Sequence, residues 1–314
     1  MTHPHSKLET ASHRVEHDLD AVVGTLAVVT PRLAASWAPL LVCVASACAP
    51  SAPPDARALA PADTALLPAY AHNDYRNARP LEAALALGLR GVEVDCFLVN
   101  GRFLVGHDRF ALDTSRTLER LYLDPLRDHV RRHGTVLPGG EPLLMNIELK
   151  TDGQAAFNAL HELLASYREL FTVVEDGTMR PGPVRVILVG WQPPLEWLAR
   201  QSPRFVAVQR HARELWADHA EYPSHLLALV SAEYEQLSRW QGLGPPPAGL
   251  LEQLDHLAET AHRVPGRLLR VYAVPVNSVV YRTLLTGGVD LIGVDDLERG
   301  YAALLQAARA AVSR

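Results

Sequence analysis

Short apolar runs alternate with amphipathic helical runs along most of the chain, and this alternation limits the fold more than any other feature. Eight apolar runs of five to nine residues are rich in Val, Leu and Ile, the pattern of strands that are buried on both faces. They occupy 67–74, 91–99, 143–150, 184–190, 205–209, 225–231, 268–275 and 291–296. Helical patterns stand between most of them at 80–88, 115–134, 153–170, 193–201, 249–264 and 278–288, and a final helix is expected over 297–313.

Strands and helices that alternate in this way predict an α/β fold, specifically a (β/α)8 TIM barrel over residues 67–314. Hydrophobic residues make up 48% of the chain, which is ample for one large core. An open, doubly wound sheet is the alternative, but no glycine-rich phosphate turn follows the first strand. The helical pattern is weakest over 210–224, and Asn100-Gly101 predicts a hairpin turn after the second strand.

The N-terminal part of the chain has the pattern of a targeting segment rather than of a folded element. Arg32 leads into an apolar stretch that ends in Val-Ala-Ser-Ala-Cys at Cys48, which resembles a bacterial lipobox. We therefore expect 1–48 to be an N-terminal extension with a signal and lipobox segment, and 49–66 to be a flexible Pro- and Ala-rich linker. The resulting prediction is an exported lipoprotein of the cell envelope, anchored at Cys48. A disordered cytoplasmic extension is the alternative.

Charge and cysteine content argue against a nucleic-acid partner and against a disulfide within the barrel. The formal net charge is −5 and no run of Lys and Arg forms a basic stripe, so nothing indicates a nucleic-acid partner. Cys96 is the only thiol in the predicted barrel, so the barrel can contain no internal disulfide. We expect Cys96 to be a small buried hydrophobic residue.

Acidic residues stand at the positions where a parallel barrel places its chemistry, the C-terminal ends of the strands. Glu93 and Asp95 are two residues apart on the second strand and therefore point to one face. Glu148 on the third strand adds a further carboxylate at the same level. Three carboxylates without a cysteine or a third histidine favour a hard ion, Mg²⁺ or Ca²⁺, over zinc. Ordinary salt bridges to Arg or Lys are the alternative.

Two histidines and a lysine stand at neighbouring strand ends. His72 closes the first strand, His107 follows the hairpin after the second, and Lys150 closes the third. Imidazole suits proton transfer because its pKa lies near neutral pH. A single histidine at such a position is as easily a surface or capping residue, so it is their combination with the acids that indicates catalysis.

The stretch 71–108, AHNDYRNARPLEAALALGLRGVEVDCFLVNGRFLVGHD, together with NIELK at 146–150, resembles the glycerophosphodiester phosphodiesterase-like superfamily. The similarity is greatest to its altered inheritance of mitochondria branch, which shares HNDY, E-x-D, VGHD and a late DDL. The resemblance implies that His72 and His107 are the catalytic pair and that the metal ligands are Glu93, Asp95 and Glu148. It also implies substrate contacts from Asn73, where many relatives have Arg, from Tyr272, where relatives have Trp, and from Lys150 and Asn277.

The function expected from these residues is that of a metal-dependent phosphoric diester hydrolase with one divalent cation, Mg²⁺ or Ca²⁺. Its substrate would be a glycerophosphodiester or a phospholipid. A catalytically idle envelope barrel that binds a phosphorylated ligand is a second hypothesis. A glycosidase that uses Glu93 and Glu148 as its acid pair is a third, but it leaves both histidines and Lys150 without roles. The sequence does not assign the acid and the base between the two histidines.

Overall fold

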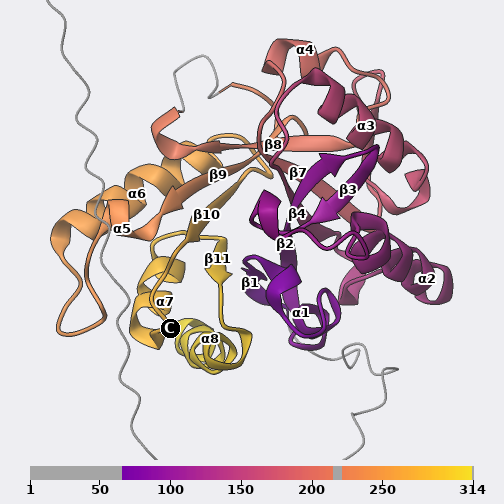
Figure 1. Ribbon diagram of the computed structural model, residues 1–314. Coiled ribbons are helices and arrows are strands. Elements are labelled where there is room, and N and C mark those ends of the chain that lie inside the picture. The colour runs from indigo at the N-terminus through magenta and orange to yellow at the C-terminus, as the bar shows by residue number, and fades with distance from the viewer. Residues whose placement is uncertain (1–65, 215–220, 313–314) are drawn as a thin grey trace, which may run out of the picture. The chain divides into compact units, whose positions relative to one another are not determined.

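The computed structural model describes residues 66–214 and 221–312, which form a closed barrel of parallel strands (Figure 1). β1 pairs with both β2 and β11, and this pairing closes the ring. The ring order is β1 (Leu67–Ala71), β2 (Leu89–Val99), β4 (Leu143–Leu149), β7 (Val184–Gly190), β8 (Val206–His211), β9 (Leu227–Glu233), β10 (Leu268–Tyr272) and β11 (Leu291–Val294). The predicted (β/α)8 barrel is thus confirmed. The signal segment, Cys48 and all but the last residue of the linker lie outside the described residues.

The helices follow the strands much as the sequence patterns predicted. They are α1 (Glu82–Ala86), α2 (Asp124–His133), α3 (Gln154–Ala165), α4 (Leu195–Ala199), α5 (Tyr234–Leu237), α6 (Ala248–His262), α7 (Ser278–Thr286) and α8 (Leu297–Val312). The helix expected over 115–134 is divided into a π-helical turn, η3 (Glu119–Leu123), and α2. Pro125, the second residue of α2, has no N–H to donate to the preceding turn, which accounts for the change of winding there.

Three features differ from the predicted elements. The short helix α5 was not predicted. Of the weak helical pattern over 210–224, the structure describes only a 3₁₀ turn, η6 (Ala212–Glu214), while 215–220 lie outside the described residues. The hairpin of β5 (Val173–Glu175) and β6 (Thr178–Arg180) was not predicted. Its turn residues, Asp176 and Gly177, have φ of 48° and 75°, as a two-residue type I′ turn requires. An Asp-Gly pair between short strands was the signal that could have identified it.

The hairpin after β2 is present as predicted and brings the chain back toward the barrel. β3 (Arg102–Val105) pairs antiparallel with the end of β2, and the turn is formed by Asn100 and Gly101 with φ of 49° and 76°. The backbone N–H of Gly106 then donates to the carbonyl of Asp95 at 3.1 Å. The loop that begins with His107 therefore starts at the level of Asp95, at the mouth of the barrel.

Side chains alternate along β2 between two hydrophobic layers. Val92, Val94 and Cys96 belong to the layer between strands and helices, and Cys96 is a fully buried free thiol, as expected. The opposite face of the strand points into the barrel, where a smaller core is formed by Tyr70, Leu144, Ile187, Ala207, Ala228, Leu229 and Leu291. Glu93 and Asp95 are on this inward face, above that core.

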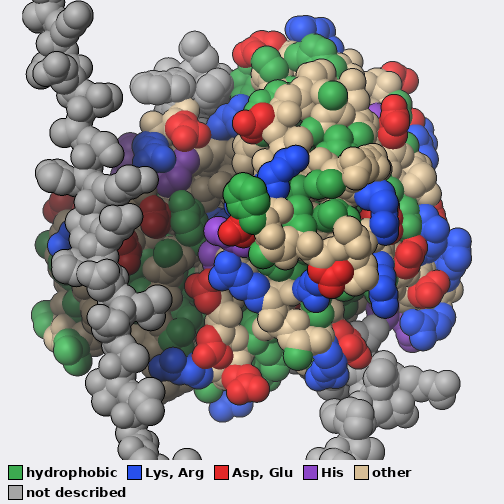
Figure 2. Space-filling view, viewed as in Figure 1, with side chains coloured by type: hydrophobic (Ala, Val, Ile, Leu, Met, Phe, Trp, Pro, Cys, Tyr) green, Lys and Arg blue, Asp and Glu red, His purple; other side chains and the backbone are tan. Residues whose placement is uncertain are grey.

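The surface in Figure 2 shows Lys and Arg side chains interspersed with Asp and Glu, without a broad area of one sign. Within the part of the chain that the structure describes, no helix has the length and apolar character needed to cross a bilayer.

A buried carboxylate anchors the loop that follows β1. Asp74 is fully buried in the short turn η1 (Asp74–Arg76) and accepts hydrogen bonds from the Leu81 backbone, the Tyr122 hydroxyl and the Asn77 amide. Burial raises its pKa from 3.8 to about 6 in spite of these donors. Asp74 thus ties the loop to both α1 and η3.

Asp74→Asn is expected to alter the pH dependence of stability. Because the carboxyl loses its proton more readily when unfolded, the wild-type free energy of unfolding falls as pH rises from about 4 to 6. The pKa shift corresponds to a fall of about 3 kcal/mol in the free energy of unfolding of the wild type. The variant lacks the titrating carboxyl and should not show this fall. Urea denaturation of both proteins between pH 4 and 7 measures this. A difference between them that is constant across that range would contradict the prediction.

Candidate active site

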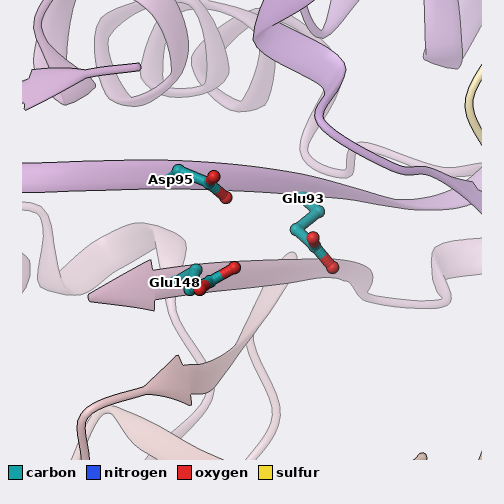
Figure 3. Close-up of side chains that lie close together, drawn as sticks. All are labelled: Glu93, Asp95 and Glu148. Atoms are coloured by element: carbon teal, nitrogen blue, oxygen red, sulfur yellow. The ribbon is translucent and has the colours of Figure 1, made fainter. Parts of the chain in front are cut away.

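Three carboxylates from two neighbouring strands converge inside the mouth of the barrel. Asp95 on β2 lies in register with Glu148 on β4, and Glu93 lies one inward-facing position earlier on β2. One oxygen from each of the three lies within 4.8 Å of the others, and Figure 3 shows the side chains directed into the space between the strands. Glu93 and Asp95 are 2% and 0% exposed, while Glu148 is partly accessible. The predicted convergence is therefore present.

The chemistry of this cluster fits a hard divalent cation. All three groups offer oxygen, and Asp95 Oδ1 is buried without a hydrogen-bond donor among the described residues. Asn146 on β4 lies beside Glu93 in the strand register, and its Oδ1 is also buried without a donor in the described part of the chain. Unsatisfied buried oxygens are costly unless a donor or a cation compensates them. The acidic cluster can thus bind a metal, and Asn146 is a neighbouring oxygen to which the sequence assigned no role.

Protein cations also contact every member of the cluster. Arg270 on β10 pairs with Glu93 Oε2 at 2.7 Å. Lys150, directly after β4, lies 2.7 Å from Glu148 and 3.2 Å from Asp95. Burial lowers the pKa of Arg270, but the charge of Glu93 and the interactions with Tyr70 and Tyr272 together outweigh it, so the pKa is raised overall. The salt-bridge alternative from the sequence is therefore also observed, side by side with the convergence that favours a metal.

Arg270 is a site residue that sequence reasoning missed. It is 3% exposed, its Nη1 donates to Gln209 Oε1 at 2.9 Å, and its guanidinium packs over the Tyr70 ring at 4.4 Å. The available signal was a lone arginine within an otherwise apolar strand, two residues before Tyr272 and so on the same inward face.

His72 is bound between two carboxylates. Its Nδ1 lies 2.6 Å from Asp295 Oδ1 and its Nε2 lies 3.3 Å from Glu93 Oε1. Burial opposes the charged ring, but the hydrogen bond to Asp295 and the charges of Glu93 and Asp295 outweigh it, so the pKa of His72 is raised. The same hydrogen bond lowers the pKa of Asp295. His72 therefore carries its proton more readily than a free imidazole does.

His107 is in a different environment. It is exposed in the loop after β3, and within the described residues it makes no hydrogen bond or ion pair. The neighbouring bond from Gly106 to the Asp95 carbonyl places the start of this loop beside the acid cluster. The structure thus fixes His72 by two contacts and leaves the His107 ring exposed.

Asn73 and Tyr75 support the cluster from the loop after β1. The Tyr75 hydroxyl shares its proton between Asn73 Oδ1 at 2.7 Å and Asp95 Oδ2 at 2.9 Å. Asn73 is buried and adopts a left-handed conformation with φ of 50°, which Asn tolerates better than most residues. The side chain predicted to contact substrate is therefore engaged in positioning a candidate metal ligand. Tyr75 was not singled out from the sequence.

The two remaining predicted contacts lie in different settings. Tyr272 lies at the site, with its ring centre 6.2 Å from that of His72 and the Arg270 guanidinium 5.2 Å from it. Asn277 instead caps α7, where its Oδ1 accepts from the N–H groups of Val279 and Val280. Its Nδ2 donates to the Gln241 carbonyl, so its amide is already used in the fold.

A cavity of about 610 Å³ opens beside the His72–Asp295 pair. Its walls come from the segments after β9 and β10, and polar groups form much of them. The lining comprises Tyr234, Glu235, Ser238, Arg239, Gln241, Ala273, Val274, Pro275 and Asp295. A ligand in this space would lie next to the carboxylate that holds the imidazole.

Comparison with known proteins supports the resemblance seen in the motifs. Residues 60–139 match the family model of the AIM6-like phosphodiesterase domain. A homolog of altered inheritance of mitochondria protein 6 from Arthroderma benhamiae is 31% identical over 150 residues, which are 40% of this chain and 48% of the relative. The Eremothecium gossypii protein of that name is 27% identical over 263 residues, 73% of this chain and 67% of the relative. The chain is a relative of the altered inheritance of mitochondria branch. The first of these matches spans about half of the relative's length, and the family model covers the barrel only from β1 through α2.

Solved structures align with the chain at low similarity. A glycerophosphodiester phosphodiesterase from Agrobacterium tumefaciens has 18% identity and a TM-score of 0.40, over 74% of this chain and 97% of that protein. A mutant tryptophan synthase alpha-subunit from Pyrococcus furiosus has 13% identity and a TM-score of 0.42, over 80% and 100%. Values this low support no inference about activity.

Asp295→Asn is expected to lower the pKa of His72, because it replaces the charged acceptor of the hydrogen bond that most favours the imidazolium with a neutral amide. NMR titration of the His72 ring measures the change. Asp296→Asn is the matched control, since the neighbouring Asp296 accepts from the Arg299 backbone at the start of α8 and has no contact with His72. A His72 titration that is the same in the Asp295 variant and in the wild type would refute the assignment.

Proposed function

We propose that the barrel hydrolyses phosphodiesters with the help of one divalent cation, Mg²⁺ or Ca²⁺, held by Glu93, Asp95 and Glu148. The observation that carries the proposal is the convergence of three carboxylate oxygens within 4.8 Å, next to a histidine whose pKa is raised. The match to a phosphodiesterase domain family over the segment that supplies both histidines, Glu93 and Asp95 supports it.

Charge balance supports a phosphodiester as the ligand. Glu93, Asp95, Glu148 and Asp295 contribute four negative charges, while Arg270, Lys150 and a protonated His72 contribute three positive ones. A divalent cation would turn this small negative excess into a small positive one, which suits a phosphodiester with its single negative charge. When bound, the cation would stabilise the charge that develops on the phosphoryl oxygens. Lys150, which is partly accessible beside Glu148, is proposed to contact the same oxygens.

The two histidines are proposed to divide the proton transfers. The raised pKa of His72 and its bond to Asp295 favour its protonated form, which suits a general acid that donates to the leaving oxygen. The His107 ring, exposed and without a bound partner in the described region, is then left as the base that accepts a proton from the attacking oxygen.

The proposed substrate is a glycerol- or lipid-linked phosphodiester. Export and attachment to the cell envelope through Cys48 remain a further proposal, which rests on the N-terminal sequence alone.

A barrel that binds a phosphorylated ligand without turnover is the second candidate, and one observation favours it. Both buried carboxylates already have a protein cation, Arg270 for Glu93 and Lys150 for Asp95, so the site is largely neutralised by the chain itself. Metal binding without hydrolysis of any diester in a broad panel would select this candidate.

Glu148→Gln is expected to weaken Mg²⁺ or Ca²⁺ binding and to lower kcat/KM on a generic phosphodiester by roughly a hundredfold or more. Glu148 is the most accessible of the three acids, so the variant should retain its fold. Glu141→Gln is the control, since it removes only the surface pair with Arg90 near the other end of β4. Calorimetric metal titration and diester hydrolysis, with and without chelator, measure the two effects. Full activity in the Glu148 variant or in chelator would rule out the metal site.

Leaving-group dependence is expected to separate the roles of the histidines. A nitrophenolate departs without a proton, so His72→Ala should lose roughly a hundredfold or more on an alkyl diester but little on a nitrophenyl diester. His107→Ala should lose activity on both. Parallel kinetics with the two substrates check this, and the opposite pattern would assign the acid to His107 instead.

A further inference from the structure

The most exposed large apolar side chains of the described residues lie around the mouth of the barrel. Phe110 is 97% exposed and Leu243 is 85% exposed. Phe110 lies in the loop 106–118 that follows β3, and Leu243 lies in the loop 238–247 that joins α5 to α6. These two loops are called the rim loops below. The first begins beside Asp95, where the Gly106 N–H donates to the Asp95 carbonyl, and the second follows the C-terminal end of β9 through α5, so both belong to the face that carries the carboxylates.

The rim loops lie on opposite sides of that face. The first is attached to β2 through the β2–β3 hairpin, and the second follows β9. Three strands separate β2 from β9 in either direction around the ring. β3 and α5 accordingly appear on opposite sides of the barrel in Figure 1. The acid cluster and His72 thus lie between two exposed apolar groups.

Local contacts hold the backbone of both rim loops. Asp108 accepts from the Phe110 N–H at 2.9 Å and caps the turn η2 (Arg109–Ala111). In the second loop, Trp240 Nε1 donates to the Leu243 carbonyl at 2.8 Å. Gly242, with φ of 86°, packs so closely on Asn277 that a Cβ there would lie 2.6 Å from its Oδ1.

Exposed arginines accompany the two apolar groups. Arg109 precedes Phe110 directly, and Arg239 is four residues before Leu243. Both are exposed, and within the described residues neither forms an ion pair. Guanidinium groups bind phosphate through two parallel hydrogen bonds. Arg239 also lines the 610 Å³ cavity beside Asp295. A phosphate-bearing surface that contacts the rim loops would therefore bring its phosphates to the opening of this cavity.

This arrangement fits a phospholipid bilayer better than other occupants. A water-soluble diester gains nothing from apolar groups that stand outside the cavity. A protein partner would be expected to meet one continuous apolar patch, whereas these groups are separated by the polar opening. A fluid bilayer can accept separate side chains among its acyl chains while its phosphates meet the arginines.

We propose that the rim loops dock the barrel on phospholipid membranes, with Phe110 and Leu243 inserted and Arg109 and Arg239 on lipid phosphates. The substrate would then be a phosphodiester of a membrane lipid. This last step rests on the proposed function, but the docking itself does not.

Sedimentation with phosphatidylcholine vesicles, with and without phosphatidylserine, tests the docking. The full chain carries Cys48→Ser in every sample, which removes any lipid anchor. Phe110→Ser with Leu243→Ser should weaken vesicle binding by about tenfold or more, because two apolar side chains are lost from the interface. The control pair is Met179→Ser with Leu251→Ser, which are 44% and 40% exposed on β6 and α6, and it should bind as the parent does.

Hydrolysis assays separate this proposal from that of the function. A soluble nitrophenyl diester should be cleaved equally by all three proteins, while cleavage of vesicle lipid should fall only in the rim variant. Docking is overturned if the parent does not bind vesicles, if both double variants lose binding equally, or if the rim variant changes only the oligomeric state measured by light scattering. Vesicle binding without cleavage of any diester would uphold the docking and reject the hydrolase.

Discussion

The ion pair between Glu93 and Arg270 is the interaction on which the site depends. A carboxylate that is 2% exposed inside a barrel would be too costly to ionise without a compensating charge. Arg270 provides that charge from β10, across the barrel interior. The pair leaves the second oxygen of Glu93 near His72. The position of Glu93 therefore helps to orient the His72 ring, whose other nitrogen contacts Asp295.

The motif after β1 supports the fold and the site together. Asp74 binds the loop to η3, and Tyr75 extends from it to Asp95. Asn73 completes the bridge, and His72 stands at its beginning. A change in any of these residues would therefore alter the carboxylate cluster as well as the loop.

The acidic cluster is partly neutralised by side chains of the protein itself. Lys150 contacts both Asp95 and Glu148, so a cation in the cluster must share these oxygens with the ammonium group. Movement of Lys150 toward a substrate phosphate would release them. The lysine is half-buried on a flexible stem, and its contacts with Glu148 and Asp95 raise its pKa in spite of its burial. In the structure, Lys150 neutralises part of the charge of Asp95 and Glu148.

The alternation of strands and helices, the spacing of Glu93 and Asp95 and the level of Glu148 were determined by local sequence. Side-chain direction along a strand follows from its period of two, and parallel strands end at one face. For this reason the barrel and the convergence of its acids could be predicted. What only the tertiary structure decided is which side chains meet across the ring. Arg270 and Asp295 are 177 and 223 positions from their partners Glu93 and His72, so no local pattern could pair them. The capping role of Asn277 and the exposure of His107 likewise depend on how the loops pack once the barrel closes.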